Sequence, residues 1–89
     1  MIAVSFSSSF VRAYHKQVKE NQIFKSLFDE KLKLFLENPF DSKLKTHKLS
    51  GKLKEIWSFS INYQIRVTFS FIDDNKVIFE NIGTHDKVY

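Results

Sequence analysis

The sequence predicts an α+β fold in which an N-terminal helical hairpin covers one face of a small, mostly antiparallel sheet. Two stretches with the apolar spacing of helices follow a short strand, and three stretches with strand alternation occupy the second half of the chain. At 89 residues the chain can form one modest core, so residues 1–89 are expected to be a single domain. The expected order is β-α-α-β-β-β, with four strands.

The first half of the chain carries the predicted hairpin. Residues 2–6 alternate as a short strand, and the three serines that follow can cap a helix. Phe10, Tyr14 and Val18 recur every four residues, which predicts a helix from about Ser8 to Glu20. A second helix is predicted from its apolar face, and Pro39 ends it. That face consists of Ile23, Phe24, Leu27, Phe28, Leu32 and Phe35.

The second half carries the sheet. Gln64 to Phe71 alternates apolar with polar residues, which predicts a half-buried central strand. Ile56 to Ile61 and Lys76 to Ile82 are its predicted neighbours. The intervening Asp73-Asp74-Asn75 is expected to be a tight turn rather than a metal site, because Asp and Asn are ordinary turn formers.

Arg66, one of only two arginines, projects from the middle of the central strand. Its parity places it on the polar face, away from the helices, together with Ser58 and Ser60 of the preceding strand. This face is expected to stay open and to carry any chemistry. The alternative is that Arg66 forms a cross-strand ion pair with Glu55 or Glu80.

Residues 40–54 form the most basic segment of the chain. Within it no acidic residue lies between Asp41 and Glu55. This segment is interpreted either as a solvated lysine-rich loop or as a loop that binds the backbone phosphates of a nucleic acid. Its basic side chains are Lys43, Lys45, His47, Lys48, Lys52 and Lys54.

Composition indicates a cytoplasmic protein with an anionic partner. The net charge is +4 and the chain has no cysteine, which excludes disulfides and thiolate metal sites. The sequence contains no signal peptide and no apolar run long enough to span a membrane.

Basic side chains, histidines and a tyrosine without clustered carboxylates suit RNA cleavage. The RNA 2′-hydroxyl can attack the adjacent phosphate if a base takes its proton, an acid protonates the leaving 5′-oxygen and a cation offsets the developing charge. Histidine suits the proton transfers, and arginine suits the charge stabilisation. No metal or cofactor is required.

The second half of the chain contains five distinctive motifs, His47-Lys48-Leu49-Ser50-Gly51, Trp57-Ser58-Phe59, Arg66-Val67, Asp73-Asp74 and Ile82-Gly83-Thr84-His85-Asp86-Lys87-Val88-Tyr89. These motifs resemble the RelE/ParE superfamily of bacterial toxins, most closely its RelE and YafQ-like branches. The resemblance covers Val4 to Tyr89, and its specific motifs begin at His47. It implies a toxin of a type II toxin–antitoxin pair with a β-α-α-β-β-β fold, and a ribosome-dependent endoribonuclease that cuts mRNA.

The resemblance also implies roles for single residues. His85 matches a G-T-H histidine and is expected to be the general acid, and Tyr89 matches a terminal aromatic that orients or stacks on the nucleotide. Arg66 matches the arginine that contacts the scissile phosphate, and His47 matches the histidine of an H-x-L-x-G segment. The strand histidine of YafQ-like toxins is missing from residues 60–64. This leaves His47, Lys52 or Lys54 as the base.

The expected partners are mRNA on the ribosome, with contacts to ribosomal RNA, and an acidic antitoxin protein that forms a hetero-oligomer with the toxin. Two other functions stay open. One is inhibition of DNA gyrase without cleavage, as in the ParE branch, and the other is a decayed toxin that only binds its antitoxin.

Overall fold

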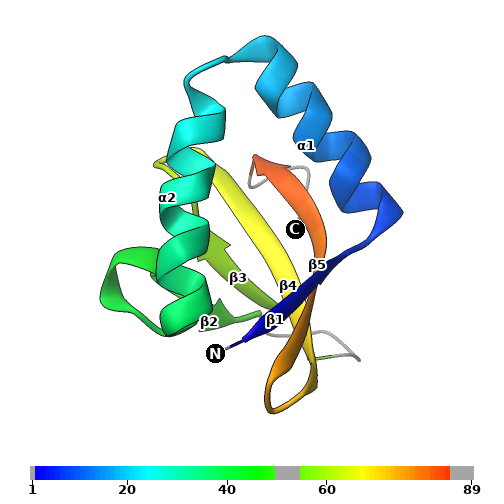
Figure 1. Cartoon of the computed structure of the whole chain (residues 1–89), viewed down its shortest axis with the longest axis vertical. Helices are drawn as coiled ribbons and strands as arrows, with labels where there is room; N and C mark the ends of the chain where they lie inside the picture. The colour runs from blue at the N-terminus through cyan, green and yellow to red at the C-terminus, as the bar shows by residue number, and fades with distance from the viewer. Residues whose placement is uncertain (1, 50–54, 85–89) are drawn as a thin grey trace.

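The computed structural model describes residues 2–49 and 55–84 of the chain (Figure 1). The predicted α+β class and the helical hairpin are both confirmed. The elements in chain order are β1 (Ala3–Phe6), α1 (Ser8–Glu20), α2 (Phe24–Glu37), the 3-10 helix η1 (Ser42–Leu44), β2 (His47–Lys48), β3 (Trp57–Ser60), β4 (Ile65–Asp73) and β5 (Lys76–Thr84).

The sheet has the strand order β1-β5-β4-β3-β2. β1 pairs with β5 in parallel, and the other pairs are antiparallel. The predicted count of four strands was wrong because it omitted β2. A strand of two residues is too short to show alternation, so only its pairing with β3 reveals it.

The helix boundaries follow from local capping. The Ser7 Oγ accepts a hydrogen bond from the Phe10 N–H (3.0 Å) and donates one to the Glu80 carbonyl of β5 (2.8 Å). The start of α1 is therefore fixed to the sheet. α2 ends at Glu37, two residues before Pro39, as predicted.

The core is aromatic and lies between the helices and the sheet. Phe35 of α2 is fully buried against three rings of the sheet. Its ring centroid lies 4.8 Å from that of Phe59, 5.0 Å from that of Phe69 and 5.2 Å from that of Phe79. These contacts leave the other face of the sheet for polar residues.

That polar face is less open than the sequence predicted. Ser58, Thr68 and Ser70 are buried on it. The Ser70 Oγ donates a hydrogen bond to the Glu80 carboxylate (2.7 Å). Arg66 and Ser60 are only half-buried, so solvent reaches this face at the C-terminal end of β3 and the N-terminal end of β4. The predicted Asp73 turn is confirmed, with the Asn75 N–H donating to the Asp73 side chain (2.8 Å).

Candidate functional site

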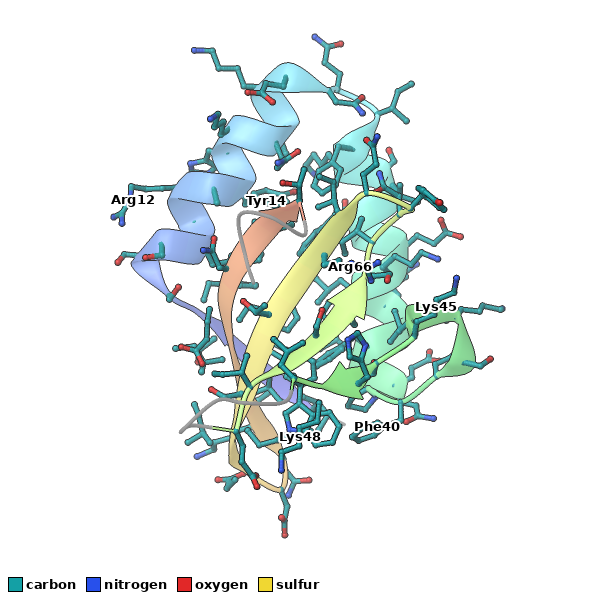
Figure 2. All side chains as sticks on the ribbon, turned by 180° about the vertical axis from the view of Figure 1, so that it is seen from behind. Arg12, Tyr14, Phe40, Lys45, Lys48 and Arg66 are labelled. Atoms are coloured by element: carbon teal, nitrogen blue, oxygen red, sulfur yellow. The ribbon has the colours of Figure 1, made fainter. Side chains whose placement is uncertain are left out.

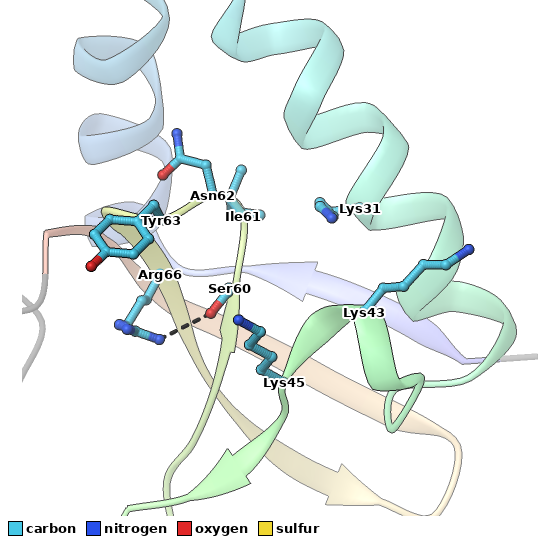
Figure 3. A pocket seen from close by; sticks show the side chains of 8 residues that line it. All are labelled: Lys31, Lys43, Lys45, Ser60, Ile61, Asn62, Tyr63 and Arg66. Carbon is cyan, nitrogen blue, oxygen red and sulfur yellow. Dashed lines mark hydrogen bonds between the residues drawn. The ribbon is translucent and has the colours of Figure 1, made fainter.

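A pocket of about 490 Å³ opens where β2 stops short of the end of β3 (Figure 3). β2 pairs with Trp57 and Ser58 but does not reach Ser60. The η1 turn and α2 form the other walls of the pocket. The residues that line it are Lys31, Lys43, Lys45, Ser60, Ile61, Asn62, Tyr63 and Arg66.

Arg66 of β4 lines the side of this pocket that the sheet forms. Its Nη1 donates a hydrogen bond to the Ser60 Oγ (2.9 Å), which fixes one edge of the guanidinium group (Figure 3). Its Nε is buried and has no hydrogen-bond partner among the described residues. Buried donors are normally satisfied, so this unusual environment marks Arg66 as a candidate ligand-binding residue.

The alternative ion pairs of Arg66 are absent from the described residues. Glu55 instead contacts the Lys48 Nζ (3.0 Å), and Glu80 accepts the hydrogen bond from Ser70. No ion pair within residues 2–49 and 55–84 includes Arg66. The arginine therefore keeps its charge available to the pocket.

The η1 turn brings two of the predicted lysines to the pocket. The Asp41 side chain accepts a hydrogen bond from the Lys43 N–H (2.9 Å), and Lys45 ends the turn in a left-handed conformation with φ of 54°. Figure 3 shows the Lys45 side chain directed toward Ser60 and Arg66. The described part of the basic segment is thus ordered here, with the Lys43 and Lys45 side chains exposed at the wall of the pocket, and phosphate binding by this segment stays a prediction.

The described lining of the pocket contains four basic side chains and no acidic one. Three of them come from Lys31, Lys43 and Lys45, and the fourth from Arg66. Positive charges gathered around one concave surface repel one another and concentrate anions there. The arrangement suits a phosphate group, with hydrogen bonds from Ser60 and Asn62 available beside the cations.

His47 lies beside the pocket on the same face of the sheet. It pairs with Ser58 in register, two residues along β3 from Ser60, the partner of Arg66, which is about 7 Å. The His47 Nδ1 lies 3.1 Å from the Lys45 carbonyl oxygen. Because a carbonyl only accepts, Nδ1 carries the hydrogen, and a neutral ring presents its Nε2 lone pair as a base.

The sequence also matches a known protein family over almost its whole length. The family model that describes the bacterial toxin of type II toxin-antitoxin system, YafQ, matches residues 2–89. The chain belongs to this toxin family. The resemblance seen from the motifs is therefore confirmed for the superfamily and for its YafQ-like branch.

Solved structures share the fold of this toxin. A metal-bound toxin from Helicobacter pylori is 22% identical with a TM-score of 0.79, and covers 100% of both chains. YafQ in the E. coli DinJ-YafQ complex is 16% identical with a TM-score of 0.78, over 100% of this chain and 99% of that one. A YoeB dimer from Staphylococcus aureus is 22% identical with a TM-score of 0.76, and the match covers 94% of this chain and 97% of that chain. No curated protein matches the sequence significantly.

Some predicted site residues of the toxin do not meet at the pocket. Lys48 forms its exposed ion pair with Glu55 and does not line the pocket, so its role in RNA binding stays a prediction. His85, Tyr89, Lys52 and Lys54 lie outside the described residues.

The prediction of the site from the sequence did not include four of the lining residues, Lys31, Ile61, Asn62 and Tyr63. Lys31 lies outside the predicted apolar face of α2, and its spacing does not distinguish it from its charged neighbours. Tyr63 lies in the β3–β4 turn and is 96% exposed at the rim of the pocket. A tyrosine between two predicted strands was the available signal for a surface contact.

The resolved pKa shifts of the toxin lie outside the pocket lining, at the α1–α2 interface. Burial raises the pKa of Tyr14, and the negative charge of Asp29 raises it further. The hydrogen bond to Asp29 raises the pKa of Lys25.

Neither helix in the described part of the chain has the length and hydropathy of a membrane span.

Proposed function

We propose that this toxin is a metal-independent endoribonuclease that cleaves mRNA on the ribosome, in the cytoplasm. The pocket would hold the scissile phosphate between Arg66 and the lysines. The observation that carries the proposal is the Arg66 guanidinium, which Ser60 fixes through Nη1, which forms no ion pair among the described residues, and which lines the pocket with three lysines. A preorganised donor of this kind suits charge that develops on a phosphoryl oxygen.

In the proposed reaction the 2′-oxygen of the RNA attacks the adjacent phosphorus atom, and the bond from phosphorus to the 5′-oxygen breaks. The products are a 2′,3′-cyclic phosphate and a 5′-hydroxyl. His47 would take the 2′-proton through Nε2, since the hydrogen bond to the Lys45 carbonyl occupies its Nδ1. His85 would protonate the leaving oxygen and Tyr89 would orient the nucleotide, both by the family resemblance alone.

The test is primer extension on an mRNA that is being translated in a purified system, with the toxin added, with and without ribosomes. We expect cuts only with ribosomes, and none in the ribosome-free control with or without EDTA. Arg66→Ala should lower cleavage by about 10²- to 10³-fold, the usual cost of removing one charge-stabilising donor. Its thermal midpoint should stay nearly unchanged.

Arg12→Ala provides a matched control, since Arg12 is the other arginine and is exposed on α1. It should cleave like the wild type. Intact mRNA together with inhibited gyrase supercoiling would replace this proposal with the ParE-like function. A large fall in the midpoint of Arg66→Ala would mean that the arginine is structural.

The proposed protein partner is the cognate antitoxin, as in the DinJ-YafQ complex, and we place it away from the pocket. β1 is an edge strand whose Ala3 and Ser7 N–H groups point to β5, so those of Val4 and Phe6 point outward. Beside this edge lies an apolar pocket of about 220 Å³. Its lining residues are Phe6, Phe10, Val11, Tyr14, His15 and Phe28.

An extended segment could pair with β1 and insert an apolar side chain into that pocket. The basic α1 residues Arg12 and Lys16 favour an acidic partner. Val11→Glu should weaken antitoxin binding in isothermal titration while cleavage stays intact. Arg66→Ala should lower cleavage while antitoxin binding stays intact. Antitoxin binding without any cleavage by the wild type would identify a decayed toxin.

A further inference from the structure

Three aromatic rings form a cluster at the end of the sheet that lies away from the pocket. The Phe40 ring centroid lies 5.4 Å from that of Trp57, in an edge-on arrangement, and 6.2 Å from that of Phe71. Trp57 and Phe71 lie 6.0 Å apart and are only partly buried. We call these three residues the Phe40 platform.

Phe40 is 52% exposed, although the loop that carries it is held firmly. Its N–H donates to the Asn38 side chain (3.0 Å), and the Asp41 N–H donates to the Asn38 carbonyl (3.0 Å). The Thr46 hydroxyl donates to the Pro39 carbonyl across the loop. These bonds fix a large apolar ring in contact with water, which is unfavourable unless something covers it.

Basic side chains flank the platform. Figure 2 shows Phe40 and Lys48 near the lower end of the sheet, with Lys45 above them and Arg66 further up. Two nearby acids are already engaged, since Asp41 caps the Lys43 N–H and Glu55 contacts Lys48. The Lys48–Glu55 pair is exposed, so it contributes little and leaves the lysine free to exchange partners.

Aromatic rings with neighbouring lysines are the usual surface for single-stranded nucleic acid. Rings stack on unpaired bases of any sequence, and lysines contact the phosphates between them. The pocket and the platform share the segment from Phe40 to Lys48. A core role alone would explain Trp57 and Phe71, but it does not explain a fixed, half-exposed Phe40.

We propose that the Phe40 platform stacks an unpaired RNA base, as a binding site separate from the phosphate pocket. This inference rests on the proposed RNA-cleaving function. The base can belong to the mRNA or to ribosomal RNA, since the stacking chemistry is the same. Phe40 contributes to binding and takes no part in the chemical step.

The test compares Phe40→Leu, which removes the ring but keeps an apolar side chain, with Phe40→Tyr, which keeps the ring. Ile72→Ala is the control at a nearby exposed apolar residue, 59% exposed at the end of β4. Affinity is measured for a 2′-O-methylated single-stranded RNA, which cannot be cleaved, for empty ribosomes and for ribosomes carrying mRNA. Thermal midpoints are recorded for every variant.

We expect Phe40→Leu to weaken binding by roughly 5- to 150-fold, the range for loss of one stacked base. Phe40→Tyr and Ile72→Ala should bind like the wild type. If Phe40→Leu loses affinity for the free RNA and for mRNA-carrying ribosomes but not for empty ribosomes, the stacked base belongs to the mRNA. If it loses affinity for empty ribosomes, the stacked base belongs to ribosomal RNA. Unchanged binding of Phe40→Leu in all three arms would overturn the platform. A wild-type toxin that binds no RNA would overturn the proposed function as well.

Discussion

At the scale of single residues, the basic pocket lined by Arg66 and three lysines gathers groups that do not stabilise the folded protein. Four basic side chains face one cavity, and the buried Arg66 Nε has no partner among the described residues. Both features are unfavourable in the free protein, because like charges repel and a buried donor loses its water. Such arrangements are typical of sites whose missing partner is a ligand.

Lys31 allows a test of this pocket with a matched control on the same helix. Lys31→Ala should weaken binding of single-stranded RNA and lower the log–log salt slope by about 0.7, the value for one phosphate contact. Lys33→Ala removes an exposed lysine that does not line the pocket, so it should leave the slope unchanged. Fluorescence anisotropy over a range of salt concentrations measures both variants. Equal effects of the two changes would show that only the overall charge matters.

At the scale of elements, two local features place the sites. β2 has only two residues, so the end of β3 remains uncovered and the pocket can form there. Ser7 joins the start of α1 to β5 through its two hydrogen bonds. The first feature creates the phosphate pocket, and the second fixes the wall of the apolar pocket beside β1.

Ser7→Ala should lower the free energy of unfolding by about 1 kcal/mol, since it removes the N-cap of α1. The bond to the Glu80 carbonyl is lost with it, so the effect should reach the upper part of the usual range. Ser8→Ala is the control, because Ser8 lies in the first turn and is exposed. Urea denaturation of both variants provides the measurement. A Ser7→Ala protein as stable as Ser8→Ala would contradict the capping role.

At the scale of the whole molecule, stability depends on one aromatic core. Phe35 joins α2 to three strands through Phe59, Phe69 and Phe79. Each of these rings is fully buried. Since the total stability of a small domain is about 5–15 kcal/mol, the loss of one such ring is a large fraction of it.

Phe35→Ala should cost about 3–5 kcal/mol of unfolding free energy, because it leaves a cavity among the surrounding rings. Tyr63→Ala removes an aromatic ring that is 96% exposed, and should change stability by less than about 0.5 kcal/mol. Thermal and urea denaturation compare the two variants. A small effect of Phe35→Ala would mean that the core can collapse around the missing ring.

The sequence alone determined the class of fold, the helical hairpin and the face on which Arg66 lies. These depend on periodicity, which is local and visible in the chain. Ser8 to Glu20 was predicted for α1, and the structure has the same bounds. The motifs also indicated the toxin superfamily by resemblance, which the family match confirms.

Only the tertiary structure decided which side chains meet. β2 was missed because two residues show no period, and Lys31 was missed because α2 delivers it to the pocket from outside the basic segment. The exposure of Phe40 likewise depends on how its loop is held against β3 and β4. Contacts between residues far apart in the sequence set these positions, and local sequence patterns do not predict such contacts.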